Sequence, residues 1–145
     1  MIALFALSLA LGADAAPPPE LVAYEHVRVA LVTDDLALAK AALPELLSTL
    51  QSDAAAQKAA GAIGGASDLP AARLAFGELS KALIANYATV GAPDGVHVYY
   101  CPMTTTFPYW LQTESGLKNP YMGTMMPICG EGVAFKAAAK AATSP

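Results

Sequence analysis

The chain has 145 residues, a formal net charge of −4 and a pI near 4.9. This length is typical of one domain, and the acidic balance argues against nucleic acid as a ligand, because nucleic acids bind basic surfaces. Charged residues make up only 14% of the sequence, and alanine raises the hydrophobic fraction to 55%. Weakly charged, alanine-rich segments predict helices that pack closely together rather than a large aromatic core.

The first sixteen residues have the pattern of a secretory signal peptide. Residues 1–11 are an apolar run, residues 13–15 read Ala-Asp-Ala as the A-x-A cleavage pattern requires, and three prolines follow at residues 17–19. A run of about eleven apolar residues is too short to span a bilayer as a helix. We therefore expect export to the periplasm, with residues 1–16 as the signal and no stable membrane span.

Residues 17–90 are predicted to form an antiparallel bundle of three or four helices, because the connections between the helical segments are short. Apolar residues recur at helical spacing in residues 21–31, 36–50 and 72–87, and the alanine-rich residues 53–62 add a short helix. The chain as a whole is therefore expected to be mostly α.

Start and stop signals divide this helical region. Thr33 and Asp34 are the expected start of the second helix, and Pro44 should kink or break it. Ser67 or Asp68 should cap the last helix, since a proline in the first turn that follows is well tolerated.

Residues 91–135 lack helical periodicity and are rich in Pro, Gly, Tyr, Thr and Met. Two short strands are predicted at residues 96–100 and 109–112, which makes this region a C-terminal loop or short β-hairpin packed on the bundle. Residues 119–123 contain the Asn-Pro and Gly signals of a turn. Residues 136–145 are the expected tail, in which residues 136–142 can form a helix or fray, because alanine and lysine alone do not fix it.

Both cysteines of the chain have a methionine within three residues. Cys101 and Met103 form the motif C-x-M, and Met126 and Cys129 form the motif M-x-x-C. Thiolates and thioethers are soft donors, which select Cu(I) over hard cations, whereas zinc prefers thiolate and imidazole ligands. Together the two motifs supply four sulfur atoms, so the sequence predicts a copper site made by Cys101, Met103, Met126 and Cys129.

Each of these residues also has an alternative role. In an oxidising compartment Cys101 and Cys129 can form a disulfide, which would stabilise the fold by about 3–4 kcal/mol in the chain-entropy model. The methionines of both motifs, and Met122 and Met125 beside them, can instead fill gaps in packing. His97 is either a nitrogen ligand near Cys101 or a solvent-facing strand residue.

Signatures of common enzymes are missing from the sequence. It contains no G-x-S-x-G, no glycine-rich phosphate loop and no H-E-x-x-H. A catalytic cysteine needs an electropositive setting, and Cys101 has no basic neighbour in the sequence. We therefore expect a binding protein rather than an enzyme.

The C-terminal motifs occur in a fixed order: Cys101-Pro102-Met103, Trp110-Leu111, Asn119-Pro120-Tyr121 with Gly123 and Met126, then Cys129-Gly130. This order resembles a family of exported bacterial domains of unknown function, which occur alone or attached to periplasmic adaptor proteins of heavy-metal efflux pumps. The pattern of that family runs C-P-M, Trp-Leu, N-P-Y-x-G-x-x-M and C-G. The resemblance implies a helical domain with a C-terminal metal-binding loop that handles copper or a related metal.

The sequence thus predicts a periplasmic protein that binds copper, with Cu(I) favoured, and either sequesters it or transfers it to an efflux partner. The expected partners are the copper ion and a heavy-metal efflux adaptor or another copper protein of the envelope. The alternative is an interaction domain of the cell envelope, stapled by a Cys101–Cys129 disulfide and without metal.

Overall fold

The computed structural model describes residues 16–50 and 52–145 and is mostly helical, with a small three-stranded antiparallel sheet in its C-terminal region. The helices are α1 (Pro19–Val32), α2 (Leu36–Ala41), α3 (Leu43–Thr49), α4 (Ala54–Gly64), α5 (Leu69–Val90) and α6 (Phe135–Thr143). The strands are β1 (His97–Tyr100), β2 (Tyr109–Gln112) and β3 (Glu131–Val133), and a short 3-10 turn, η1 (Gly123–Met125), precedes β3.

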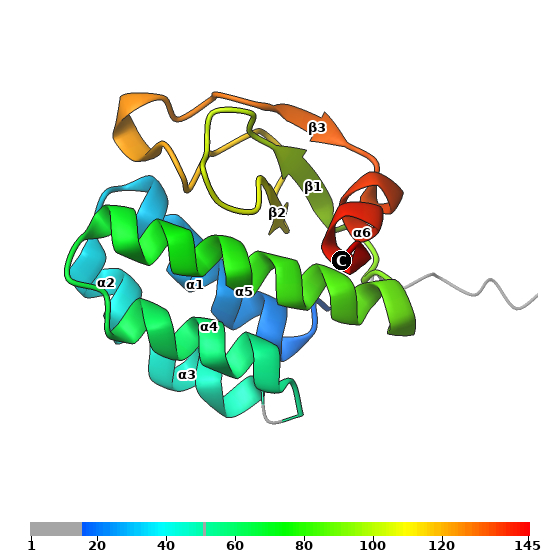
Figure 1. Cartoon of the computed structure of the whole chain (residues 1–145), viewed down its shortest axis with the longest axis horizontal. Coiled ribbons are helices and arrows are strands. Elements are labelled where there is room, and N and C mark those ends of the chain that lie inside the picture. Colours follow the sequence, from blue (N-terminus) through cyan, green and yellow to red (C-terminus); the bar gives the residue numbers. More distant parts are fainter. Residues whose placement is uncertain (1–15, 51) are drawn as a thin grey trace, which may run out of the picture.

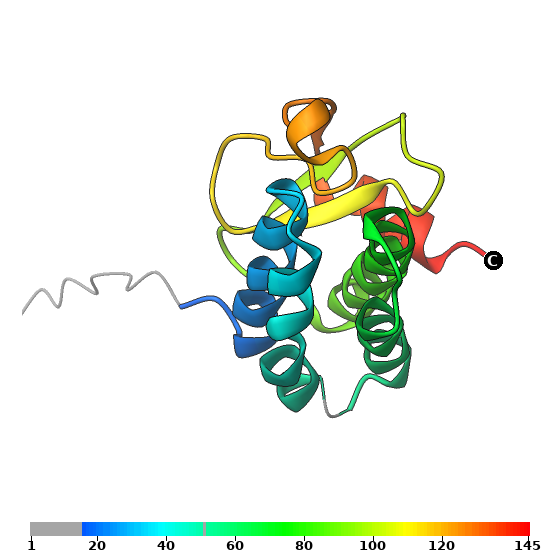
Figure 2. The same cartoon turned by 90° about the vertical axis from the view of Figure 1, so that its left-hand side faces the viewer.

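The sheet and its loops lie on one side of helices α1 to α5, as Figures 1 and 2 show from two directions. Helix α5 packs against α4 and also contacts β2 and α6. The strand order is β2-β1-β3, so β1 is central and runs antiparallel to both neighbours. The ends of β1 and β3 that carry the cysteines are therefore held next to each other.

Aromatic side chains fill the junction between the helices and the sheet. Tyr24 of α1 stacks on Phe76 of α5 with ring centroids 4.9 Å apart. Tyr121 packs edge-on against Phe76 at 6.0 Å and against Trp110 of β2 at 5.7 Å. These four aromatic residues join the N-terminal helices to the C-terminal loop.

The predicted start of the second helix is wrong by one or two residues. Thr33 ends α1, and Asp34 stands between the helices in the left-handed region at φ 59°. The N-cap of α2 is Asp35, whose carboxylate accepts a hydrogen bond from the Leu38 amide at 2.8 Å. Because Asp35 caps α2, the carboxylate of Asp34 can bind other partners.

Other sequence signals are confirmed. The predicted break at Pro44 separates α2 from α3, and Pro44 itself lies in the first turn of α3. Asp68 caps α5 by accepting the Ala71 amide at 2.9 Å. Asp53, which was not predicted as a cap, caps α4 in the same way.

The C-terminal region contains more regular structure than was predicted. The strands expected at residues 96–100 and 109–112 are β1 and β2, but β3 was not predicted, because three residues carry almost no periodic signal. The helix expected at residues 136–142 is α6, whose Ala138 and Ala142 are buried. Their burial gives α6 a packed face, which the sequence did not predict.

The predicted signal peptide lies outside the described residues, apart from residue 16. Within the described part of the chain, no helix combines the length and the apolar character needed to cross a bilayer.

Candidate metal site

The two cysteines, 28 residues apart in the sequence, come together at one end of the sheet. Cys101 directly follows β1, and Cys129 lies two residues before β3. Antiparallel pairing of Tyr100 with Glu131 aligns these ends. The two Sγ atoms are 3.8 Å apart, and both residues are free thiols.

Gly130 makes this close approach possible. It adopts φ 127°, a region that L side chains rarely enter. A Cβ atom added at this position would overlap the carbonyl oxygen of Tyr100. Any larger residue would therefore push the segment before β3 away from the end of β1, and would separate the thiols.

Asn119 holds the loop that carries Cys129. Its side chain is fully buried, and its amide nitrogen donates to the Cys129 carbonyl at 2.6 Å. Its Oδ1 accepts from the amides of Tyr121 at 2.8 Å and Met122 at 3.0 Å, and its own backbone N–H donates to the carbonyl of Pro127 at 2.7 Å. One side chain thus fixes both ends of the loop, because it satisfies groups before and after the turn.

Arg73 and Asp34 fasten the same loop to the helices. Arg73 of α5 donates to the carbonyl of Pro120 and to the carbonyl of Leu31, each at 2.9 Å, and pairs with the Asp34 carboxylate. Asp34 in turn accepts hydrogen bonds from the amide and the hydroxyl of Thr124. These hydrogen bonds from Thr124, with that from Arg73, hold the pKa of Asp34 below its ordinary value of 3.8.

Replacing Asp34 with asparagine should destabilise the protein near neutral pH, with a difference that shrinks in acid. The pKa of Asp34 is lower in the folded than in the unfolded chain, so its carboxylate stabilises the fold fully above about pH 4 and loses this effect as the pH falls through the folded value. Asparagine is a suitable replacement, because it tolerates the positive φ of this position. Urea unfolding of both proteins at pH 6 and at about pH 3 measures the difference; a gap that widens in acid would contradict the assignment.

A buried ion pair anchors the segment before Asn119. Arg28 of α1 is 1% exposed and bonds through Nε to the Glu25 carboxylate at 2.7 Å. Glu25 also accepts the Thr113 amide at 2.7 Å, and Arg28 donates to the Lys118 carbonyl at 3.2 Å. Helix α1 thereby binds both ends of the segment between β2 and the Cys129 loop.

The two thiols differ in accessibility. Cys101 is fully buried, and its amide donates to the Pro108 carbonyl at 3.0 Å. Cys129 is only partly buried and follows a run of exposed residues, 124–128. Partial burial raises the pKa of Cys129, and so do its hydrogen bond with Cys101 and the charge that Cys101 carries as a thiolate. The site therefore has one inner and one outer sulfur atom.

The predicted thioether ligands lie at the surface of the same region. Met103 is 61% exposed and Met126 is 41% exposed. Met103 also lines a shallow groove with Leu74, Tyr121 and Met122. The amide of Cys129 donates to the carbonyl of Met126 at 3.1 Å, so Met126 and Cys129 belong to one turn. The structure thus brings the two thiols into contact and leaves both thioethers on the outside of the loops that carry them.

The histidines stand apart from the thiols. His97 begins β1, four residues before Cys101, and an extended strand of that length spans about 13 Å. That separation is too long for the two side chains to share an ion. His26 pairs with Glu45 at 3.0 Å on the surface of the helices. In residues 16–50 and 52–145, no three side chains of His, Cys, Asp or Glu are grouped as metal ligands.

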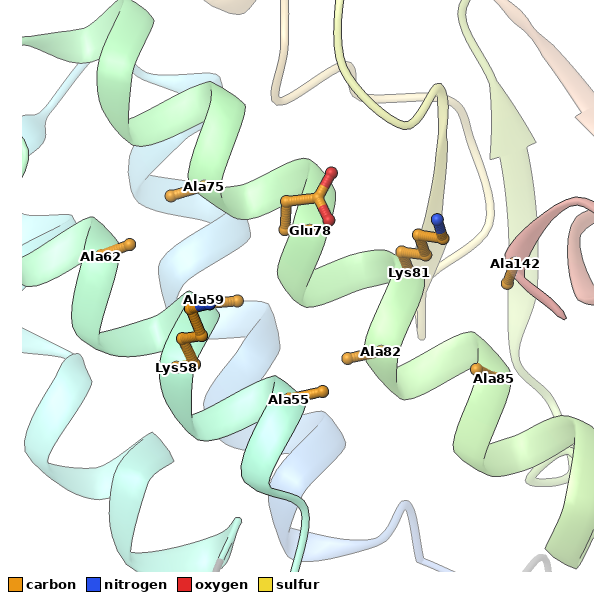
Figure 3. Close-up of a pocket in the computed structure, with 10 residues that line it drawn as sticks. All are labelled: Ala55, Lys58, Ala59, Ala62, Ala75, Glu78, Lys81, Ala82, Ala85 and Ala142. Carbon is orange, nitrogen blue, oxygen red and sulfur yellow. The ribbon is translucent and has the colours of Figure 1, made fainter. Parts of the chain in front are cut away.

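A second concave region lies between α4 and α5 (Figure 3). This alanine groove has a volume of about 470 Å³, and the side chains that form it are short because seven of its ten residues are alanine. Lys58, Glu78 and Lys81 are its charged members. It contains no sulfur ligand and is separate from the thiol pair.

In comparisons with known proteins, no family model, no curated protein and no solved structure matches the chain.

Several residues that build the site were not predicted from the sequence. Asn119 and Gly130 were predicted only as parts of motifs, Asp34 was predicted as part of a helix start, and Arg73 was given no role in the site. Gly130 had a detectable signal, since a glycine directly after a candidate ligand often marks a left-handed or crowded backbone position. Arg73 had none, because its partners are 39 to 47 residues away.

Proposed function

We propose that this chain is a periplasmic copper-binding protein that holds Cu(I) between Cys101 and Cys129, within a helical bundle that carries the sulfur motifs on its C-terminal loops. The observation that carries the proposal is the 3.8 Å separation of the two Sγ atoms. Two thiolates bound to one ion at about 2.3 Å, as in zinc sites, lie about 3.8 Å apart at a tetrahedral angle. Two thiols at that spacing can share an ion with little rearrangement.

Met103 and Met126 complete the proposed ligand set. Each lies within three residues of a thiol, and each is exposed enough to turn toward an ion without leaving a cavity in the core. Thioethers favour Cu(I), which is a soft ion. Exposed thioethers also suit exchange, because an incoming acceptor can displace them before it reaches the inner thiol. The resemblance of the motifs to domains associated with heavy-metal efflux supports transfer to an envelope partner.

The reduced protein should bind about one Cu(I) per chain, in competition with a chromophoric Cu(I) chelator under anaerobic conditions. Cys101→Ser should weaken binding by more than about 100-fold, since removing a residue that merely orients a ligand already costs about 10–100-fold. Met126→Leu should weaken it less, by about tenfold.

Met125→Leu is the matched control, because Met125 is the neighbouring methionine and is 83% exposed. It should bind copper like the unaltered protein. Unchanged affinity in both Cys101→Ser and Met126→Leu would contradict the proposed site.

The same thiol contact also favours a second function, that of an interaction domain stapled by a disulfide. A disulfide needs the sulfur atoms to move from 3.8 Å to about 2.05 Å, which side-chain rotation can supply. Thiol counting on protein isolated from the periplasm separates the two functions. A complete lack of free thiols, with no copper uptake after reduction, would favour the staple.

A further inference from the structure

The thiol pair is asymmetric in a way that copper binding alone does not require. Cys101 is fully buried and Cys129 is partly exposed, yet their Sγ atoms are in contact at 3.8 Å. Two sulfur atoms in contact, of which solvent reaches only the outer one, have the arrangement needed for stepwise thiol–disulfide exchange.

Thiol–disulfide exchange begins when a thiolate attacks one sulfur of a disulfide in a direct approach, so the attacking sulfur must be accessible. A dissolved disulfide can reach Cys129 at the end of the exposed segment 124–128. It cannot reach Cys101 without local opening, because that residue is covered by the core and its backbone is fixed to Pro108. Cys101 can attack only a sulfur that is already bonded to Cys129.

We propose that Cys129 and Cys101 are a two-step exchange centre for small-molecule disulfides, with Cys129 reacting first and Cys101 second. In the first step the Cys129 thiolate bonds to one sulfur of the small disulfide, whose S–S bond breaks and releases one thiolate. In the second step the Cys101 thiolate attacks Cys129 Sγ, the mixed disulfide breaks, and the second small thiolate leaves. The protein dithiol is oxidised to a disulfide, and the small disulfide is reduced to two thiols.

This exchange also regulates the copper site, and that consequence rests on the proposed function. Metal ligation requires thiolates, and the internal disulfide has none. Oxidation of the pair therefore empties the site, whereas reduction restores it.

The order of the two steps is tested on the metal-free full chain with oxidised glutathione as the probe, followed by intact-mass measurement. Cys101→Ser retains the outer thiol and should accumulate a stable glutathione adduct. Cys129→Ser retains the inner thiol and should react at least about tenfold more slowly than Cys101→Ser, because the protein must open locally before the probe reaches Cys101. The unaltered chain should pass to the internal disulfide without accumulating the adduct.

Limited alkylation of the unaltered chain provides a second measurement that needs no variant. Under a limiting amount of iodoacetamide, Cys129 should be labelled about tenfold or more ahead of Cys101, because Cys129 is accessible and Cys101 is buried. Equal labelling, equal reactivity of the two serine variants, or a stable adduct on the unaltered chain would each overturn the proposed order.

A copper-loaded sample tests the regulatory consequence separately. Oxidised glutathione added with excess Cu(I) chelator should release copper in step with formation of the internal disulfide. Copper that stays bound while the disulfide forms would overturn the regulation. A reduced chain that takes up no copper at the start would refute the proposed function, while the order of the exchange steps is still decided on the metal-free protein.

Discussion

Replacing Arg28 with alanine should lower the free energy of unfolding by about 3–5 kcal/mol, because it leaves the Glu25 carboxylate buried without its cation. It also removes the donor to the Lys118 carbonyl, so the segment that leads into the Cys129 loop loses an anchor. Urea unfolding monitored by the single tryptophan, which is buried in β2, measures both the stability and the tertiary packing near the loop.

Two matched variants separate this explanation from a general effect of truncation. His26→Ala removes an exposed pair between α1 and α3 and should change the stability by less than about 1 kcal/mol. A double variant, Glu25→Gln with Arg28→Met, keeps an acceptor for the Thr113 amide but leaves no buried charge, and should recover most of the loss. An Arg28→Ala variant no less stable than His26→Ala would contradict the assigned role of the ion pair.

The helices could be predicted because their signals are local. An apolar stripe, an aspartate at the N-cap and a proline in the first turn all act within a few residues of one another, and α1, α4 and α5 follow them closely. Asp34 was misassigned for the same reason. Its position suggested a cap, whereas its partners Arg73 and Thr124 are 39 and 90 residues away.

The sequence indicated which sulfur atoms form the site, but it did not show how the two thiols come into contact. The pairing of cysteine with methionine indicated which atoms belong together, but β3, which aligns Cys129 with the end of β1, is three residues long and has no sequence period to detect. The different burial of the two thiols was equally invisible, because it depends on the loop that Asn119 holds and on packing against distant helices. The exchange order inferred above therefore depends on tertiary structure alone.

The tight approach at Gly130 leads to the prediction that tests the site geometry most directly. Gly130→Ala should lower the effective concentration of one thiol toward the other by about tenfold or more, and should weaken Cu(I) binding by about 10–100-fold. The added methyl group would overlap the Tyr100 carbonyl and must push the Cys129 segment away from β1. A glutathione redox buffer measures the stability of the internal disulfide, so this result does not depend on copper.

Two other glycines distinguish crowding from backbone strain. Gly132→Ala lies on β3 itself, where the new Cβ would make ordinary contact with the Tyr99 ring at 3.7 Å, and it should leave the thiols in place. Gly116→Ala has φ 90° with nothing within 4 Å, so it adds strain without a clash. If Gly116→Ala and Gly130→Ala weaken the disulfide equally, strain elsewhere in the loops explains the result. If only Gly130→Ala weakens it, the thiols are held together by the contact between Gly130 and the Tyr100 carbonyl, and the sulfur site exists because the backbone there has no side chain.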